Sequence, residues 1–298
     1  MRRLTAVVVA VTVGAGLAGT APATAADGPG PAPAALSMMA RLTGDQLVPG
    51  KDGAAAGDRD GKAIALLKVK GDRVTFALSW NGVDRPVRAH LHRGAVGSDG
   101  AVVADLFATP MPTSVYSAAG QTTLTSPALA ERLRSDPDGF YIDLHTDALP
   151  GGAVRGQLRP FAKPVNPLGI INGGGLRALA DGGQEVPAGD PKKAGDPDGH
   201  GTAFLHPRTD RVDYSLAWVN TGPPRSGNIH EGALGENGDV RLPLFLTPVP
   251  ENIFAISGSV ATPDAPMTAR LKEDPTGFYA NLTTREFPDG AVRGQLFR

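Results

Sequence analysis

The chain of 298 residues contains no cysteine, and this absence removes several kinds of chemistry at once. Disulfide bridges, zinc–thiolate sites and a cysteine nucleophile are all excluded. Aromatic residues make up only 5% of the chain, and no basic run stands out among 29 Lys and Arg against 30 Asp and Glu. Nucleic-acid binding usually needs a basic surface, and single-stranded bases stack on aromatic rings. We therefore expect no nucleic-acid partner.

Long apolar runs are also absent after the N-terminal segment, so we expect no membrane span. The N-terminal segment itself is typical of an export signal. Two arginines precede the apolar stretch Leu4 to Leu17, and Ala23-Thr24-Ala25 is a small-x-small cleavage site. We predict a bacterial-type signal peptide at 1–25, followed by a Pro/Ala/Gly-rich leader at 26–37. The protein is then secreted and extracellular.

What the chain does contain is an internal repeat. The segment Arg155-Gly156-Gln157-Leu158 returns as Arg293-Gly294-Gln295-Leu296, an offset of 138 residues, and the same offset carries Trp80 to Trp218. Such a repeat indicates two copies of one structural unit. Each copy, at roughly 120 residues, is long enough to bury its own core. We predict domain 1 at 38–162, a linker at 163–175 and domain 2 at 176–298.

Each copy has the periodicity of β-strands. In Val74 to Trp80, large apolar residues alternate with small or polar ones, and the second copy repeats the pattern from Val212 to Trp218. A period of two indicates strands with one buried face, and the high content of Gly and Pro supplies turns between them. We predict an all-β fold of two tandem antiparallel β-sandwich or barrel domains. One short amphipathic helix is expected in each copy, at Pro127 to Ser135 and at Pro266 to Glu273.

Three histidines of the first copy form a candidate metal site. His90 and His92 are two residues apart, a spacing that places both rings on one face of a strand. His145 lies on the polar face of a later strand, and if the two strands are neighbours all three rings converge at an accessible surface. Three neutral imidazoles suit copper or zinc and leave an open position for water or substrate. Ligation without thiolates in an oxidising compartment favours copper over zinc.

The second copy provides an internal control for this site. There His90 is replaced by Asn228 and His145 by Thr283, so that only His230 remains. One histidine cannot form the site, and we expect the metal in domain 1 only. One alternative interpretation is that the histidines are polar strand residues on a solvated face. For His92, which recurs as His230, a structural hydrogen bond to a turn is favoured over ligation alone.

The motifs of both copies resemble the CHRD domain, a module named after chordin that also occurs in bacterial secreted proteins. In the first copy the resemblance rests on three segments: Ala89 to Gly94 with Gly97 to Gly100, Gly139 to Thr146, and Pro150 to Leu158. It covers nearly all of the chain after the leader. The resemblance implies an all-β module and no single biochemical activity.

The first copy is also similar, more weakly, to copper, zinc superoxide dismutase. By position, this likeness implies that His90, His92 and His145 hold copper and that Arg155 guides the anion. Arg155 recurs as Arg293, where no histidine site accompanies it, so a structural role in pairing with a carboxylate or with carbonyls is the other interpretation. No histidine lies between His92 and His145, so the bridging and zinc ligands of the dismutase are missing. Together the two resemblances suggest domains that are Ig-like or superoxide-dismutase-like.

Two functions follow as hypotheses. The first is a secreted binding or scaffold protein whose partner is an unknown extracellular protein or surface ligand. The second is a protein that stores, delivers or redox-cycles one copper or zinc ion in domain 1. We expect no catalytic residues; an enzymatic activity, if present, would be that of a copper-dependent, superoxide dismutase-like oxidoreductase.

Overall fold

The computed structural model describes residues 35–49, 57–262 and 265–298. The predicted signal peptide and most of the predicted leader lie outside these residues. No helix in these three ranges is long and apolar enough to cross a membrane.

The first repeat consists of two antiparallel sheets. Strands β1, β2, β3 and β6 pair in that order, and strands β5, β4, β7 and β8 form the second sheet. The single pair Thr43–Arg155 joins β1 to β8 where the two sheets meet. The strands are β1 (Leu36–Thr43), β2 (Lys62–Lys70), β3 (Arg73–Asn81), β4 (Pro86–Arg93), β5 (Val102–Phe107), β6 (Val115–Thr123), β7 (Phe140–Thr146) and β8 (Val154–Gln157), with the short β9 (Arg159–Pro160) beside β1.

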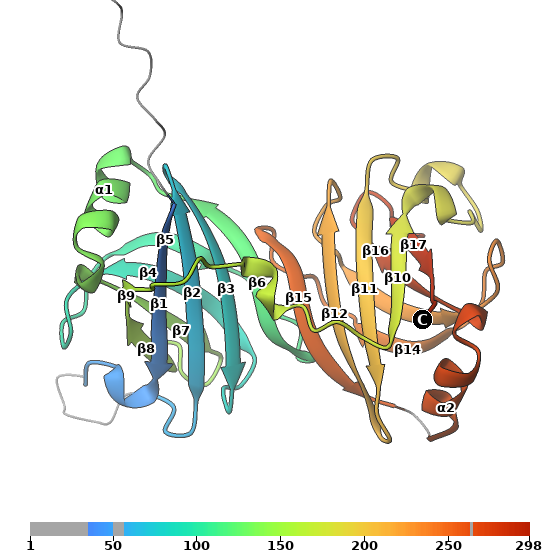
Figure 1. Cartoon of the computed structure of the whole chain (residues 1–298), viewed down its shortest axis with the longest axis horizontal. Helices are drawn as coiled ribbons and strands as arrows, with labels where there is room; N and C mark the ends of the chain where they lie inside the picture. The colour runs from blue at the N-terminus through green and yellow to red at the C-terminus, as the bar shows by residue number, and fades with distance from the viewer. Residues whose placement is uncertain (1–34, 50–56, 263–264) are drawn as a thin grey trace, which may run out of the picture. The chain divides into compact units, whose positions relative to one another are not determined.

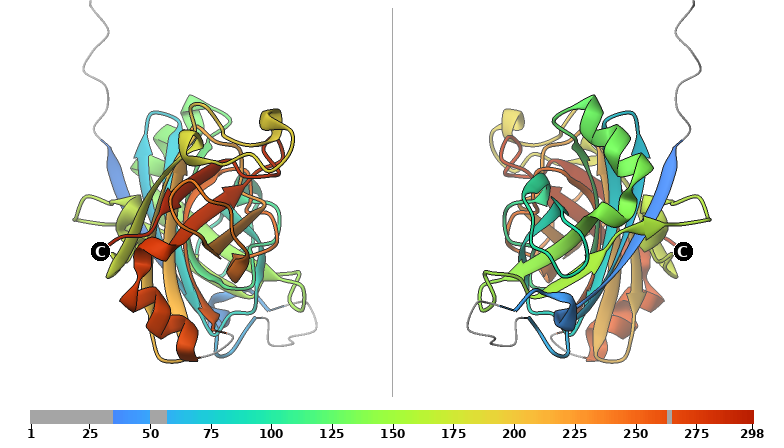
Figure 2. Two further views of the ribbon diagram at one scale, coloured as in Figure 1. Left: turned by 90° about the vertical axis from the view of Figure 1, so that its right-hand side faces the viewer. Right: turned by 90° about the vertical axis from the view of Figure 1, so that its left-hand side faces the viewer.

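The second repeat follows the same plan. Its first sheet pairs β10, β11, β12 and β15, and its second pairs β14, β13, β16 and β17. The end views in Figure 2 show the strands of each repeat in two layers. The strands are β10 (Leu176–Asp181), β11 (His200–Pro207), β12 (Arg211–Val219), β13 (Ser226–Glu231), β14 (Val240–Phe245), β15 (Ile253–Ala261), β16 (Phe278–Thr283) and β17 (Val292–Gln295). The prediction of an all-β fold is confirmed.

The core of each repeat lies between its two sheets. In β3 the side chains of Val74, Phe76, Leu78 and Trp80 are buried, as the alternation predicts. Burial of such side chains is worth roughly 1.5–3 kcal/mol each and is the main driving force for this fold. A chain without disulfides depends on these cores for its stability.

Each repeat contains one α-helix, near its predicted position (Figure 1). Helix α1 (Pro127–Ser135) starts after Ser126, whose side chain accepts a hydrogen bond from the backbone N–H of Leu129. This N-cap and the proline in the first turn explain where the helix begins. Helix α2 (Ala265–Glu273) begins one residue before the predicted Pro266.

The two repeats meet through equivalent strands. Strand β6 pairs antiparallel with β15, and the pairs Ser117–Ser257 and Ala119–Ala255 are exchanged by the repeat offset (Figure 1). The pair Ala118–Ile256 joins two equivalent positions, so a local two-fold relationship passes through it. The two repeats are therefore joined like the subunits of a symmetric dimer whose edge strands pair to form one continuous sheet.

The segment that connects the repeats packs on this junction. It contains the 3-10 helix η3 (Pro167–Ile170), and Ile170 is buried against Ala119 and Ala255. The Ser257 hydroxyl donates to the Ile170 carbonyl at 2.7 Å, and the Asn172 backbone N–H donates to Ser215 at 3.0 Å. The predicted linker is thus held against strands of both repeats.

Candidate metal centre

The candidate centre lies on neighbouring strands of the first repeat. Strands β4 and β7 are antiparallel, and His90 pairs directly with Asp143. Ala89 and Leu91 on the other face of β4 are fully buried in the core. Because successive side chains of a strand alternate between faces, the core contacts of Ala89 and Leu91 direct the histidines to the outer face of the sheet.

The structure brings the three predicted histidines together. The Nδ1 atom of His90 lies 3.1 Å from Nε2 of His145, and Nε2 of His145 lies 3.1 Å from Oδ1 of Asp143. Nε2 of His92 lies 3.0 Å from the other oxygen of Asp143. One ligand atom from each of these four residues falls within 4.8 Å of the others. The group therefore offers three nitrogens and one oxygen to a shared centre.

Backbone carbonyls determine which nitrogens face the centre. Nδ1 of His92 donates to the Gly100 carbonyl at 2.8 Å, and Nδ1 of His145 donates to the Pro150 carbonyl at 2.9 Å. A carbonyl only accepts hydrogen bonds, so both Nδ1 atoms carry hydrogen. In a neutral ring the lone pair is then on Nε2, and in both rings Nε2 faces the centre. Such outer contacts orient metal-binding histidines.

His90 is oriented the other way round. Its Nδ1 faces the centre, 3.5 Å from Oδ1 of Asp143, while its Nε2 lies 3.6 Å from Oδ1 of Asp105, a largely exposed carboxylate on β5. A carboxylate therefore lies on each side of the ring. In the tautomer with hydrogen on Nε2, His90 also presents a lone pair to the centre.

Asp143 was not predicted as a ligand. It lies on the same strand face as His145. Like His90 and His145, it is replaced in the second copy, where Asn281 stands at the equivalent position, and this difference is the sequence signal that identifies it. Burial raises the pKa of Asp143, but the hydrogen bonds that His145, His90 and His92 donate when the nitrogens facing it are protonated outweigh this effect, and the net pKa lies well below the usual range. The carboxylate is ionised and carries the negative charge of the site.

The site is more enclosed than predicted. The sequence pattern indicated an accessible surface, whereas the exposed fractions are 9% for His92, 7% for His145 and 5% for Asp143. The turn between β4 and β5 supplies the Gly100 carbonyl and covers this face of the sheet. The position expected to stay open for water or substrate has the Asp143 carboxylate, a further candidate ligand, beside it. Four protein ligands are typical of a closed site.

The Arg155 side chain is surrounded by backbone carbonyls and an aromatic ring. It donates to the carbonyls of Ala95 and Ser98 at 3.0 and 2.8 Å and to Asp99 at 3.1 Å, and its guanidinium lies over the ring of Tyr141. It is 2% exposed. Arg293 makes the same carbonyl and ring contacts in the second repeat. These contacts match the structural interpretation of Arg155 and leave little of its guanidinium for a passing anion.

The second repeat has different chemistry at the equivalent place. Thr283 bonds to Ser226 at 2.8 Å, and the side-chain amide of Asn281 donates to Glu185 at 2.7 Å. His230 keeps the carbonyl contact of its counterpart, donating to Gly238. Among the described residues, no group of three or more His, Asp or Glu ligands gathers in this repeat. As the sequence predicts, the histidine and aspartate cluster of the first repeat has no counterpart among the described residues of the second.

Two buried polar atoms of the group lack a hydrogen-bond partner when the imidazoles are neutral. Nε2 of His92 lies 3.0 Å from Oδ2 of Asp143, and Oδ1 of Asp143 lies 3.1 Å from Nε2 of His145. With hydrogen on Nδ1 of both rings, these contacts set acceptor against acceptor, and neither atom is paired. A buried polar atom without a partner is costly, and a metal ion bound by both would remove that cost. The group of His90, His92, Asp143 and His145 could thus hold a metal ion.

Comparison with known families agrees with the fold. The family model of the CHRD domain matches twice, at residues 38–158 and 176–296. The chain belongs to the CHRD family, with two tandem copies of the domain. A search of curated proteins found no match.

Proposed function

We propose that this CHRD-family chain is a secreted binding protein whose first domain holds one copper or zinc ion. The observation that carries the metal proposal is the convergence of three imidazole nitrogens and one carboxylate oxygen within 4.8 Å of one another. The proposal assigns the ligands His90, His92, Asp143 and His145. It takes 38–162 and 176–298 as the two modules, 163–175 as the linker and 1–25 as the export signal.

The donor set supports copper or zinc as the ion. Imidazole nitrogens with one carboxylate oxygen suit both, and magnesium and calcium prefer oxygen ligands throughout. At equal availability a nitrogen and oxygen site binds Cu²⁺ more tightly than Zn²⁺. We therefore retain copper as the favoured ion in an oxidising compartment.

The ligand arrangement supports a structural role for the ion. Four protein ligands leave no obvious open position, while catalytic zinc sites keep one for water or substrate. The ion would tie β4 to β7 and, through the carbonyl contacts of His92 and His145, fix the turns at Gly100 and Pro150. The function is then binding by a metal-stabilised β-domain rather than catalysis.

The test is metal loading of the purified mature protein, followed by dialysis and elemental analysis. We expect about one ion per chain in the wild type and a higher melting temperature than in the metal-free protein. His145→Ala should lose both effects, whereas the matched change Thr283→Ala in the second repeat should lose neither. Wild-type protein without retained copper or zinc would contradict the metal proposal. Secretion is tested separately, by sequencing the N-terminus of protein recovered from the culture medium.

A further inference from the structure

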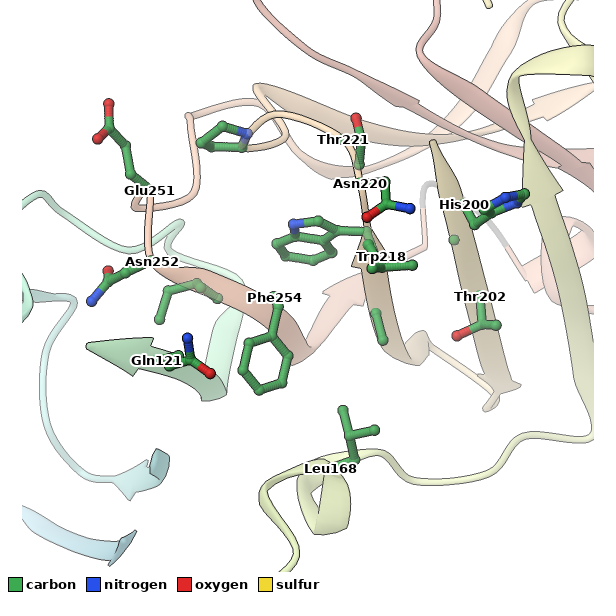
Figure 3. Close-up of a pocket in the computed structure, with 15 residues that line it drawn as sticks. Gln121, Leu168, His200, Thr202, Trp218, Asn220, Thr221, Glu251, Asn252 and Phe254 are labelled. Atoms are coloured by element: carbon green, nitrogen blue, oxygen red, sulfur yellow. The ribbon is translucent and has the colours of Figure 1, made fainter. Parts of the chain in front are cut away.

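A pocket of about 660 Å³ opens in the second repeat beside the junction with the first (Figure 3). Strands β11, β12 and β15 form its walls, and Gln121 of β6 and Leu168 of η3 extend it across the junction. Small-molecule sites typically enclose about 300–1,000 Å³ and combine apolar walls with a few polar groups. The pocket is distant in the fold from the metal centre, which lies on β4 and β7.

The first repeat has a counterpart pocket that serves as an internal control. Both pockets contain the equivalent tryptophans, Trp80 and Trp218. At the repeat offset, however, Gly82 becomes Asn220, Val83 becomes Thr221 and Thr113 becomes Glu251. At the same offset Asn81, Arg85 and Tyr116 become Val219, Pro223 and Phe254. The second-repeat pocket thus exchanges a positive charge for a negative one and presents its amide at a different position.

These polar side chains have no protein partners. Within the described parts of the chain, no hydrogen bond or ion pair engages the side chains of Gln121, Thr202, Asn220, Thr221 or Glu251. The hydroxyl oxygen of Thr221 is buried and closed off from solvent, so the accessible polar groups of the pocket are those of Gln121, Thr202, Asn220 and Glu251.

The backbone at Asn220 adds a second observation. Its φ is 57°, and it is the one non-glycine residue with positive φ in the described structure. Gly82 holds the same position in the first repeat with φ 67° and without the cost that a side chain adds. An asparagine kept in this conformation places an amide at the pocket mouth, as Figure 3 shows. Unfavourable backbone conformations of this kind cluster at ligand sites.

The lining determines the class of ligand. Phe254 and Leu168 offer apolar surface, and Figure 3 shows the largely buried indole of Trp218 between the Glu251–Asn252 segment and Asn220. The lining contains no Lys or Arg. Besides His200, its one ionisable side chain is Glu251, whose negative charge disfavours an anion. Amides, hydroxyls and a carboxylate together both donate and accept hydrogen bonds. A ligand with many neutral hydroxyls and an apolar C–H face fits this combination.

We propose that the second-repeat pocket binds a neutral saccharide. The sugar ring packs its C–H face on Phe254, beside the largely buried Trp218, and its hydroxyls pair with Asn220 and Glu251. This inference rests on the binding function proposed above, since it names the ligand class, but it does not involve the metal ligands. A failure of saccharide binding and a failure of metal binding are therefore separate results.

The experiment titrates the full mature chain with neutral tetrasaccharides of glucose, mannose and xylose, and with a sulfated heparin tetrasaccharide. Binding is measured by calorimetry and by the fluorescence of Trp218 in a Trp80→Phe background. The test variant carries Asn220→Gly and Glu251→Thr, the residues of the first repeat, which the fold accommodates there. Thr113→Val in the first-repeat pocket is the control, and His145→Ala checks independence from the metal centre.

We expect saturable binding of a neutral tetrasaccharide at millimolar or lower concentration, with a change in Trp218 fluorescence. Loss of two hydrogen-bonding groups should weaken binding about tenfold in the double variant. Thr113→Val and His145→Ala should bind like the wild type. No neutral binding, preferential binding of the sulfated sugar, or unchanged affinity in the double variant would each overturn the proposal.

Discussion

The Nδ1 atom of His90 lies 3.1 Å from the Nε2 atom of His145. Nδ1 of His145 donates to the Pro150 carbonyl, so the nitrogen that faces His90 has a lone pair when the ring is neutral. Two lone pairs at this distance repel each other unless a proton or a cation lies between them. Protons and metal ions therefore compete for the same place.

This competition predicts that metal leaves the protein as the medium becomes acidic. Asp143 favours protonation of its neighbours: burial lowers the pKa of His92, but the hydrogen bond and charge of Asp143 raise it above the ordinary value. Imidazoles must be neutral to bind a metal, so the raised pKa of His92 should start release at a higher pH than an ordinary imidazole would, and release should be extensive below about pH 6. Dialysis at stepped pH followed by elemental analysis measures it, and retention of the ion at pH 4 would contradict a centre built mainly from histidines.

Asp143 is predicted to be a ligand and not only a neighbour of the histidines. Asp143→Asn installs the residue found at the equivalent position, Asn281, and removes the charge that pairs with the ion. We expect the affinity for Cu²⁺ or Zn²⁺ to fall by at least about a hundredfold, because the change acts directly on a metal ligand. Competition with a chelator of known affinity gives the number. The reverse change Asn281→Asp in the second repeat should leave the affinity of the first centre unaltered.

Arg155 and its counterpart Arg293 are predicted to stabilise their repeats to a similar extent. Arg155→Ala and Arg293→Ala each remove donors to two loop carbonyls and a cation–π contact. We expect each to lower the free energy of unfolding by about 2–4 kcal/mol, since buried acceptors lose a charged donor. Urea unfolding of the metal-free variants measures the loss. A large effect of Arg155→Ala beside a negligible one of Arg293→Ala would point to a role specific to the first repeat.

Glu185 is predicted to make the second repeat less stable at alkaline pH. Burial raises its pKa to about 7, against opposing effects of Arg293 and Asn281. A carboxyl group whose pKa is raised on folding stabilises the native state fully below its unfolded pKa, near 4.5, and this contribution is lost as the pH rises through 7. The corresponding loss of unfolding free energy is up to about 3 kcal/mol between pH 4.5 and 8.

Glu185→Leu supplies the control, because leucine stands at the equivalent position 47 in the first repeat. Urea unfolding of metal-free wild type and variant at stepped pH should show the wild type losing stability relative to the variant as pH rises. A constant difference between the two proteins from pH 5 to 8 would show that Glu185 does not titrate in this range.

The sequence alone determined the fold class, the repeat and the two short helices. Alternation in Val74 to Trp80 predicts a half-buried strand because side-chain direction along a strand is local geometry. The same rule placed His90 and His92 on one face, and the repeat offset showed that the second copy lacks two of the three histidines. The signal peptide and secretion stay predictions.

Tertiary structure decided what local geometry cannot. Pairing of β4 with β7 placed Asp143 opposite His90, and the turn at Gly100 enclosed a face that alternation alone indicates to be accessible. The pairing of β6 with β15, and with it the pocket that reaches from Trp218 to Gln121, depends on contacts between residues more than a hundred positions apart. Periodicity reports which side chains share a face, whereas strand order and loop packing decide which of them meet and whether water reaches them.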